Sequence, residues 1–234
     1  MVGRLNVPEI MDSERCPEWL RDSMTSYLQV VIDETGLYDG AAPAIADALI
    51  LSESSHILDL DSGIGGPWPG LAESLATAGS TPGITLSDLY PNATAASRVN
   101  ALQRLSYSPN PISALDVPPE MVGMRTMFTA LHHVPSDQVR SILRSAQDAR
   151  VPFAAFEATH RSLWGVLVTL LIPVMVLVPV PRIKPVSLLT LLLTYLPPLL
   201  PVLIWWEGLA STLRTYRAFE LQEMISEIAD PSYS

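Results

Sequence analysis

The chain has 234 residues, which suits one domain with a sizeable core, and 48% of them are apolar, which excludes a largely disordered protein. The net charge of −10, with Lys184 as the only lysine and no basic run, excludes a surface that binds nucleic acid through phosphates. Cys16 is the single cysteine, so neither an intramolecular disulfide nor a metal site is expected, and a reducing, cytoplasmic location fits. Residues 1–20 are mixed and charged, unlike a signal peptide.

Helical and strand patterns alternate along the first two thirds of the chain. Apolar residues at helical spacing predict helices over 16–38 and 41–52, followed by a short apolar strand over 56–60. Further strands are expected over 83–88, 111–117, 125–131 and 152–159. Further helices are expected over 69–79, with a left-handed C-cap at Gly79, and over 94–105 and 135–149. This alternation predicts an α/β fold, a Rossmann-like doubly wound parallel sheet with helices on both faces.

Acids and glycines stand at the carboxyl ends of the first three predicted strands. They are Asp59, Asp61, Gly63 and Gly65 after the first strand, Asp88 at the end of the second, and Asp116 at the end of the third. In a parallel sheet these ends meet at one edge, where ligands bind. A glycine lets a ligand approach the backbone, and a carboxylate after the second strand can accept both hydroxyls of a ribose. The third acid is placed to bind an adenine amino group.

The order of residues in the glycine turn limits the classes of ligand that can bind there. The turn reads D-S-G-I-G-G-P-W, so Pro67 and Trp68 crowd the position where the helix of a dinucleotide-binding G-x-G-x-x-G motif begins. No Gly-Lys-Ser/Thr occurs, which excludes a P-loop. An acid before the glycines favours a cationic or hydroxyl-bearing ligand over a phosphate.

Several of these segments resemble the class I S-adenosylmethionine-dependent methyltransferases. ILDLDSGIGG is similar to their first motif, LSDLYPN to the second, ALDVP to the third, and RTMFTALHHVP to the fourth strand and its loop. Together with FEATHRS and WEGLASTLRTY, these segments resemble a bacterial branch of that family. The resemblance runs from about residue 54 to the C-terminus, and it says almost nothing about the substrate.

The resemblance implies S-adenosyl-L-methionine as the cofactor. The cofactor-binding residues it implies are Asp59, Asp61, Gly63, Gly65, Asp88, Leu89, Asp116 and Val117. Two departures stand out. Asp61 occupies a position where many members have Gly, which adds a charge beside the methionine part of the cofactor. The two strands that close the family sheet after its fifth helix are not visible before residue 234, so we expect either a shortened polypeptide or a sheet that is completed differently.

His132 and His133 follow the fourth predicted strand and are the catalytic candidates, because a histidine there could take a proton from an acceptor hydroxyl. The other interpretation is a histidine that caps a loop or binds a backbone carbonyl. Glu157 and Glu207 can be interpreted either as groups that take part in the chemistry or, equally well, as structural partners of Arg161 or Arg214. An alternative function is a methyltransferase-like fold that binds the cofactor without transferring methyl groups, as a binding module or as a scaffold for another reaction such as cyclisation.

Residues 162–206 differ from the rest of the chain, because Arg182 and Lys184 are their only charges and seven prolines interrupt them. Two uncharged runs, 162–181 and 185–206, reach the length of a membrane span, but the prolines break the second. We expect Pro-interrupted helices that form an apolar lid beside the cofactor, a hairpin in contact with the inner face of the membrane, or a spanning hairpin. The first two suggest an apolar small-molecule acceptor. The expected regions are an N-terminal cap (1–53), a cofactor-binding core (54–161), the apolar segment (162–206) and a C-terminal amphipathic helix (207–234).

Overall fold

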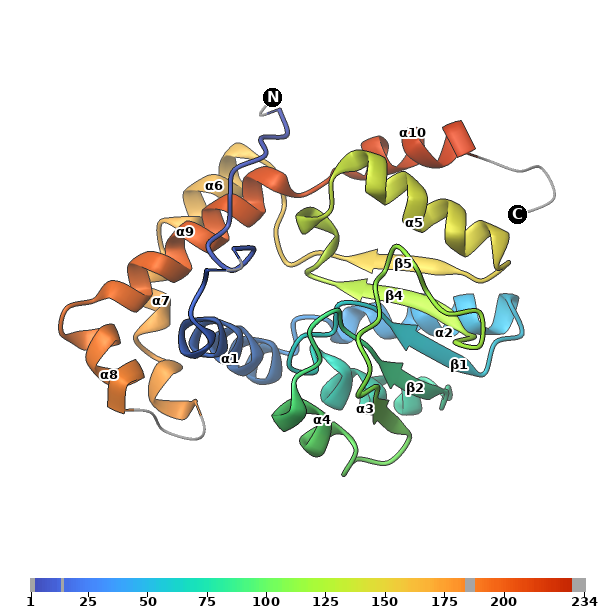
Figure 1. Cartoon of the computed structure of the whole chain (residues 1–234), viewed down its shortest axis with the longest axis horizontal. Coiled ribbons are helices and arrows are strands. Elements are labelled where there is room, and N and C mark those ends of the chain that lie inside the picture. Colours follow the sequence, from blue (N-terminus) through green and yellow to red (C-terminus); the bar gives the residue numbers. More distant parts are fainter. Residues whose placement is uncertain (1–2, 14, 184–187, 229–234) are drawn as a thin grey trace. The chain divides into compact units, whose positions relative to one another are not determined.

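A computed structural model describes residues 3–13, 15–183 and 188–228. The chain divides into two compact units (Figure 1). The sheet unit comprises Thr35–Ala158 and Ala218–Ser234, and the helical unit comprises Met1–Glu34 and Thr159–Arg217. This division differs from the four expected regions, because the two predicted N-terminal helices fall into different units.

The sheet unit contains a five-stranded sheet in which every pairing is parallel. Its strands are β1 (His56–Asp59), β2 (Gly83–Leu86), β3 (Leu105–Tyr107), β4 (Met124–Phe128) and β5 (Phe153–Phe156). The order β3-β2-β1-β4-β5 places the change of direction between β1 and β4. Ligands bind at this switch point in open α/β sheets. The Rossmann-like parallel fold predicted from the sequence is confirmed.

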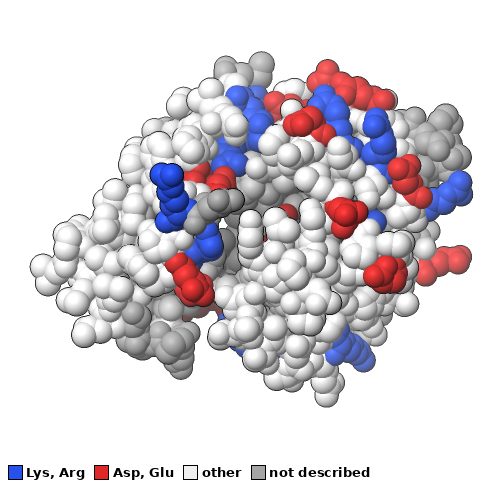
Figure 2. All heavy atoms as spheres, viewed as in Figure 1, with Lys and Arg blue, Asp and Glu red and all other residues white. Residues whose placement is uncertain are grey.

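Helices cover the sheet. They are η1 (Asp39–Ala41), α2 (Ala42–Leu51), α3 (Trp68–Thr77), α4 (Ala93–Val99), η2 (Leu131–His133), α5 (Ser136–Asp148) and α10 (Ala218–Ile228). The core is formed by fully buried strand residues such as Ile57 and Leu58, together with Leu71 of α3 and Ile142 of α5. Helix α10 packs along α5, where charged side chains gather on the face shown in Figure 2.

The helical unit contains α1 (Glu18–Thr35, whose last residue falls in the sheet unit), α6 (Leu163–Thr169), α7 (Ile172–Val176), η3 (Val180–Arg182), α8 (Leu188–Tyr195) and α9 (Leu199–Arg214). Its core joins Leu20 and Met24 of α1 to Val176 and Ile204. The described residues of 162–206, which exclude the four at 184–187, therefore form the expected short helices. Pro197 and Pro198 separate α8 from α9, because proline lacks the amide that would continue a helix.

Among the described residues, no single helix is both long and apolar enough to cross a membrane. Two pairs of consecutive helices reach the required length and composition only when taken together. One pair, Leu163–Thr169 with Ile172–Arg182, is bent by 45°, and the other, Leu188–Tyr195 with Leu199–Arg214, is bent by 80°.

Three expected elements differ from the structure. The third strand is β3, not 111–117, and the preceding helix ends at Val99 rather than at 105. Prolines at both ends of 111–117 remove ladder donors, and the segment forms a loop with an isolated Ser113–Asp116 bridge. The expected helix from 207 is also divided: α9 extends to Arg214 and α10 begins at Ala218. The described residues after β5 form helices, as expected, and Gly79 has the predicted left-handed conformation (φ +83°).

Substitution of Gly123 should destabilise the sheet unit strongly. Gly123 precedes β4 with φ +126°, and a Cβ there would lie 2.6 Å from the carbonyl oxygen of His56. Gly79 also has positive φ, but nothing lies within 4 Å of its Cβ position. We expect Gly123→Ala to lower the free energy of unfolding by about 3 kcal/mol or more, and Gly79→Ala by about 1 kcal/mol. Urea denaturation followed by circular dichroism measures both, and equal losses would contradict a tight contact at Gly123.

Candidate functional site

The turn after β1 is organised by a buried carboxylate. Asp59 is 1% exposed, and its Oδ1 accepts a hydrogen bond from Thr126 Oγ1 of β4 at 2.6 Å. Its Oδ2 accepts one from Ser62 Oγ of the turn, also at 2.6 Å. The backbone carbonyl of Asp59 accepts the hydroxyl of Ser87 at 2.8 Å. Asp59 therefore ties together β1, β4, the end of β2 and the glycine turn, and it lies beneath the turn rather than at its surface.

Asp88 lies across from this turn, after β2, and holds its backbone. The carboxylate Oδ2 of Asp88 accepts the N–H of Gly63 at 2.7 Å, and Oδ1 accepts the N–H of Tyr90 at 2.8 Å. The phenol of Tyr107, at the end of β3, donates to the carbonyl of Gly63 at 2.7 Å. A carboxylate has about four acceptor positions, so Asp88 retains the capacity for two further donors. No atom lies within 4 Å of a Cβ placed on Gly63, so the turn is open to a ligand there.

Asp61 adds a second carboxylate beside Asp88. It has a left-handed backbone (φ 56°), a conformation that among non-glycine residues favours Asp and Asn. Burial, together with the charge of Asp88, raises the pKa of Asp61 to about 6, although His133 lowers it. Burial also raises the pKa of Asp88, while the N–H groups of Tyr90 and Gly63 lower it. Two half-buried acids in mutual repulsion make an environment that a bound cation would relieve.

His132 is held by Glu157, a partner that the sequence did not predict. Glu157 follows β5, and its Oε2 lies 2.7 Å from His132 Nδ1 while its Oε1 accepts the His132 backbone N–H at 3.1 Å. The ring of His133 lies 4.1 Å from that of His132 between centroids. Of the two imidazoles, that of His132 is buried and that of His133 is partly buried. The other predicted acid, Glu207, accepts the N–H of Ile10 at 2.6 Å within the helical unit.

The remaining predicted cofactor residues are placed unequally. Leu89 is exposed directly after Asp88, whereas Gly65 is buried with Arg98 3.2 Å from its Cβ position. Asp116 is not at the end of a strand, as expected, but is exposed in the loop between β3 and β4 together with the partly buried Val117. The structure thus brings Asp61, Gly63, Asp88 and His133 together, and it anchors only the start of the Asp116 loop, through the Ile112 N–H on the Asp88 carbonyl.

Several residues of this site were not predicted from the sequence. Thr126 of β4 binds the carboxylate of Asp59, and Tyr107 of β3 binds the carbonyl of Gly63 in the turn. Thr129, just after β4, is a β-branched residue with φ 52°, an outlier of the kind that gathers at functional sites. Its hydroxyl is hydrogen-bonded to the phenol of Tyr38, whose pKa burial raises to about 12. If the third strand had been assigned to 105–107, Tyr107 would have been expected at a strand end. The spacing of residues along the sequence does not indicate that the hydroxyl groups of Thr126, Thr129 and Tyr38 form hydrogen bonds here.

No family model matches the sequence. No curated protein matches it either. Eight solved chains match by structure, among them PKMT2 from Rickettsia typhi in complex with AdoHcy. That match has 18% sequence identity and a TM-score of 0.35, and it covers 76% of this chain and 36% of the other. This chain therefore spans about a third of the length of that neighbour.

The buried carboxyl of Asp59 should make stability fall as the pH rises. Burial raises its pKa to about 7, although the hydroxyls of Ser62 and Thr126 lower it. Because its unfolded pKa is about 4, its contribution to stability is fully present below about pH 4 and is lost as the pH rises through about 7. Between about pH 5.5 and pH 8 this loss amounts to about 2 kcal/mol.

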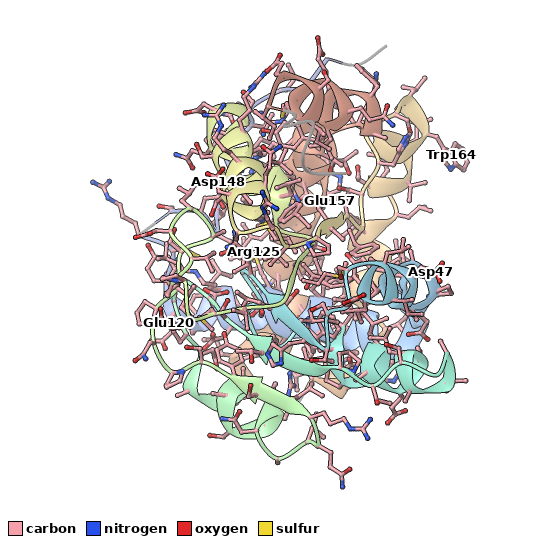
Figure 3. The ribbon with its side chains drawn as sticks, turned by 90° about the vertical axis from the view of Figure 1, so that its right-hand side faces the viewer. Asp47, Glu120, Arg125, Asp148, Glu157 and Trp164 are labelled. Atoms are coloured by element: carbon pink, nitrogen blue, oxygen red, sulfur yellow. The ribbon has the colours of Figure 1, made fainter. Side chains whose placement is uncertain are left out.

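Asp59→Asn removes this titration, so its free energy of unfolding should fall less over the same range by about 2 kcal/mol. Denaturant midpoints measured at several pH values give the slope, which separates titration from any constant change in packing. The control is Asp47→Asn, at an exposed acid of α2 (Figure 3), which should leave the slope unchanged. An identical slope in Asp59→Asn would show that Asp59 does not titrate in this range.

Proposed function

We propose that this chain is an S-adenosylmethionine-dependent methyltransferase. The observation that carries the proposal is the pairing, at the switch point of the sheet, of the open glycine turn with Asp88. Gly63 offers a backbone surface without a side chain, and Asp88 offers unused acceptor positions beside it. This is the arrangement that a ribose requires: two hydroxyl donors on one carboxylate, with the rest of the ligand passing over the turn.

The charge of the site favours this cofactor over a nucleotide with phosphates. Asp61 and Asp88 would repel a pyrophosphate, whereas S-adenosylmethionine carries a sulfonium and an ammonium group. The start of α3 also offers few N–H donors for a phosphate, because Pro67 is its N-cap and Pro69 is in its first turn. The residues present therefore fit a cationic nucleoside.

The proposed roles follow from these positions. Asp88 would accept the ribose hydroxyls, Asp61 would face the cationic amino acid part, and Asp59 would hold the turn in place without touching the ligand. The cofactor would supply an electrophilic methyl group that is ready for in-line transfer. The protein has then mainly to hold donor and acceptor in line and to exclude water.

His132 is proposed as the general base, oriented by Glu157. The pairing at 2.7 Å fixes the ring, and a base so held can accept the proton that an acceptor hydroxyl loses. An apolar small molecule is proposed as the acceptor, because many large apolar side chains among the described residues of 162–206 are exposed and the sequence has no basic run for a polyanionic substrate. The cofactor-binding scaffold without methyl transfer remains the competing function, and the experiments below distinguish the two.

Cofactor binding should depend on Asp88. Isothermal titration of the full chain with S-adenosylhomocysteine should show binding, and Asp88→Ala should weaken it by about 2–4 kcal/mol, since a charged acceptor of two hydrogen bonds is lost. Asp88→Asn, which keeps one acceptor oxygen for the turn, should fall between the two. Asp47→Ala serves as the control at an exposed acid and should bind like the unmodified chain. No heat with the unmodified chain would exclude the proposed cofactor, and an unchanged affinity of Asp88→Ala would place the ribose elsewhere.

Methyl transfer should depend on His132. Incubation with methyl-labelled S-adenosylmethionine and a cell lipid extract should yield label in an apolar product. His132→Gln should lower kcat by about 100-fold while leaving the affinity for S-adenosylhomocysteine within about twofold, because the ring acts on the acceptor. His160→Gln, at an exposed histidine, is the matched control. Tight cofactor binding without label in any product would favour the scaffold function. Loss of affinity together with kcat in His132→Gln would mean that His132 is structural.

A further inference from the structure

Two short helices of the helical unit, α6 and α8, bury threonine side chains and expose large apolar ones. In α6, Thr169 is the buried residue, while Leu163 and Trp164 are 69% and 74% exposed. In α8 the buried residues are Thr190 and Thr194, while Leu188 is 71% exposed. A helix on the surface of a soluble domain turns its apolar stripe inward and its hydroxyls outward. In these two helices the buried residues are threonines and the most exposed residues are apolar, although Leu191 and Leu193 of α8 also pack against the core of the unit.

The inward hydroxyls satisfy their hydrogen bonds within the unit. Thr194 Oγ1 donates to the carbonyl of Thr190 at 2.6 Å, and Thr169 Oγ1 donates to the carbonyl of Val166 at 2.7 Å. The hydroxyl of Thr190 lies 3.1 Å from that of Ser23 on α1. Polar groups that meet in this way need no water, which is the condition for a structure that faces hydrocarbon.

Large aliphatic and aromatic side chains form what we call the apolar exterior of the helical unit. Its most exposed members are Leu163, Trp164, Leu170, Val174, Leu188 and Leu196. The surface over α7 and α8 carries no charged side chain on the face shown in Figure 2. Figure 3 shows Trp164 pointing away from α6 into open space. Soluble monomers rarely expose more than a few hundred Å² of contiguous apolar surface, so apolar exposure on this scale marks an interaction surface.

We propose that the apolar exterior inserts into one leaflet of a lipid bilayer. Charge supports lipid as the occupant: no acid occurs between Ser162 and Trp206, although the chain has a net charge of −10, and Arg182, the one charged residue described there, is paired with Glu34 at 3.2 Å. Length supports a single leaflet. Helix α8 has eight residues and so extends about 12 Å, close to half of a hydrocarbon core of about 30 Å. Its sharp bend with α9, 80°, would return the chain to the same side.

The test uses the full chain and phosphatidylcholine vesicles, with and without phosphatidylglycerol, in a flotation gradient. We expect the protein to float with both kinds of vesicle. The combined variant Leu163→Glu, Val174→Glu, Leu188→Glu should reduce the floating fraction by at least about tenfold, because each change places a charge where hydrocarbon would be. All three side chains are at least 66% exposed, so the fold should persist, which circular dichroism verifies.

The matched control is Ile50→Glu with Leu51→Glu on α2, at apolar side chains that are 72% and 86% exposed in the sheet unit. This variant should float like the unmodified chain. Three results would overturn the proposal. The unmodified chain could stay at the bottom of the gradient. The combined variant could float undiminished, with binding that requires phosphatidylglycerol, which would indicate adsorption through charge. Light scattering without lipid could reveal an oligomer that the combined variant dissociates, which would make a second copy the occupant.

Discussion

The site depends on the buried carboxylate of Asp59. It is the last residue of β1, at the switch point, and it accepts hydroxyls from β4 and from the turn at 2.6 Å each. Those two bonds fix where the turn leaves the sheet, and hence where Gly63 meets Asp88. Burial disfavours the charged form of Asp59 and raises its pKa to about 7. Near neutral pH the charged and neutral forms of this carboxyl are therefore both populated. Either form can bond both hydroxyls, because a protonated acid can donate where the ionised one accepts.

Asp61 has a backbone conformation that glycine also adopts, but its side chain adds a negative charge to the site. The family that the turn resembles often has Gly at this position, and here the backbone has φ 56°, which explains that preference. Aspartate is among the few other residues that tolerate this conformation, so the turn survives the replacement. The added carboxylate lies near Asp88, and each raises the cost of the other's charge. The carboxylate of Asp61 therefore makes the site more favourable for a cation.

The sequence predicted four of the five strands, because each is an apolar run bounded by Gly, Pro or Asp. It missed β3, whose three residues include the exposed polar Ser106 and are too few for a periodic pattern. The segment 111–117 looked more like a strand, yet its flanking prolines exclude it from a ladder. Because of that error, Asp116 was predicted at the end of a strand, and Tyr107 was not recognised as a residue of the site. The acids and glycines of the site were predictable from local order, whereas the hydroxyls of Thr126 and Tyr38 reach the site through long-range pairing that spacing does not encode.

Hydroxyl groups serve opposite purposes in the two units. In the sheet unit they bind a carboxylate and so make a polar site possible inside an apolar layer. In α6 and α8 the threonines bind carbonyls of their own helices, so the polar groups need no solvent, and most of the leucines are exposed. Hydropathy alone does not distinguish these leucines from those of a core, since both belong to uncharged runs. The position of the threonines does, because an inward hydroxyl on a short helix leaves only apolar side chains for whatever surrounds the unit.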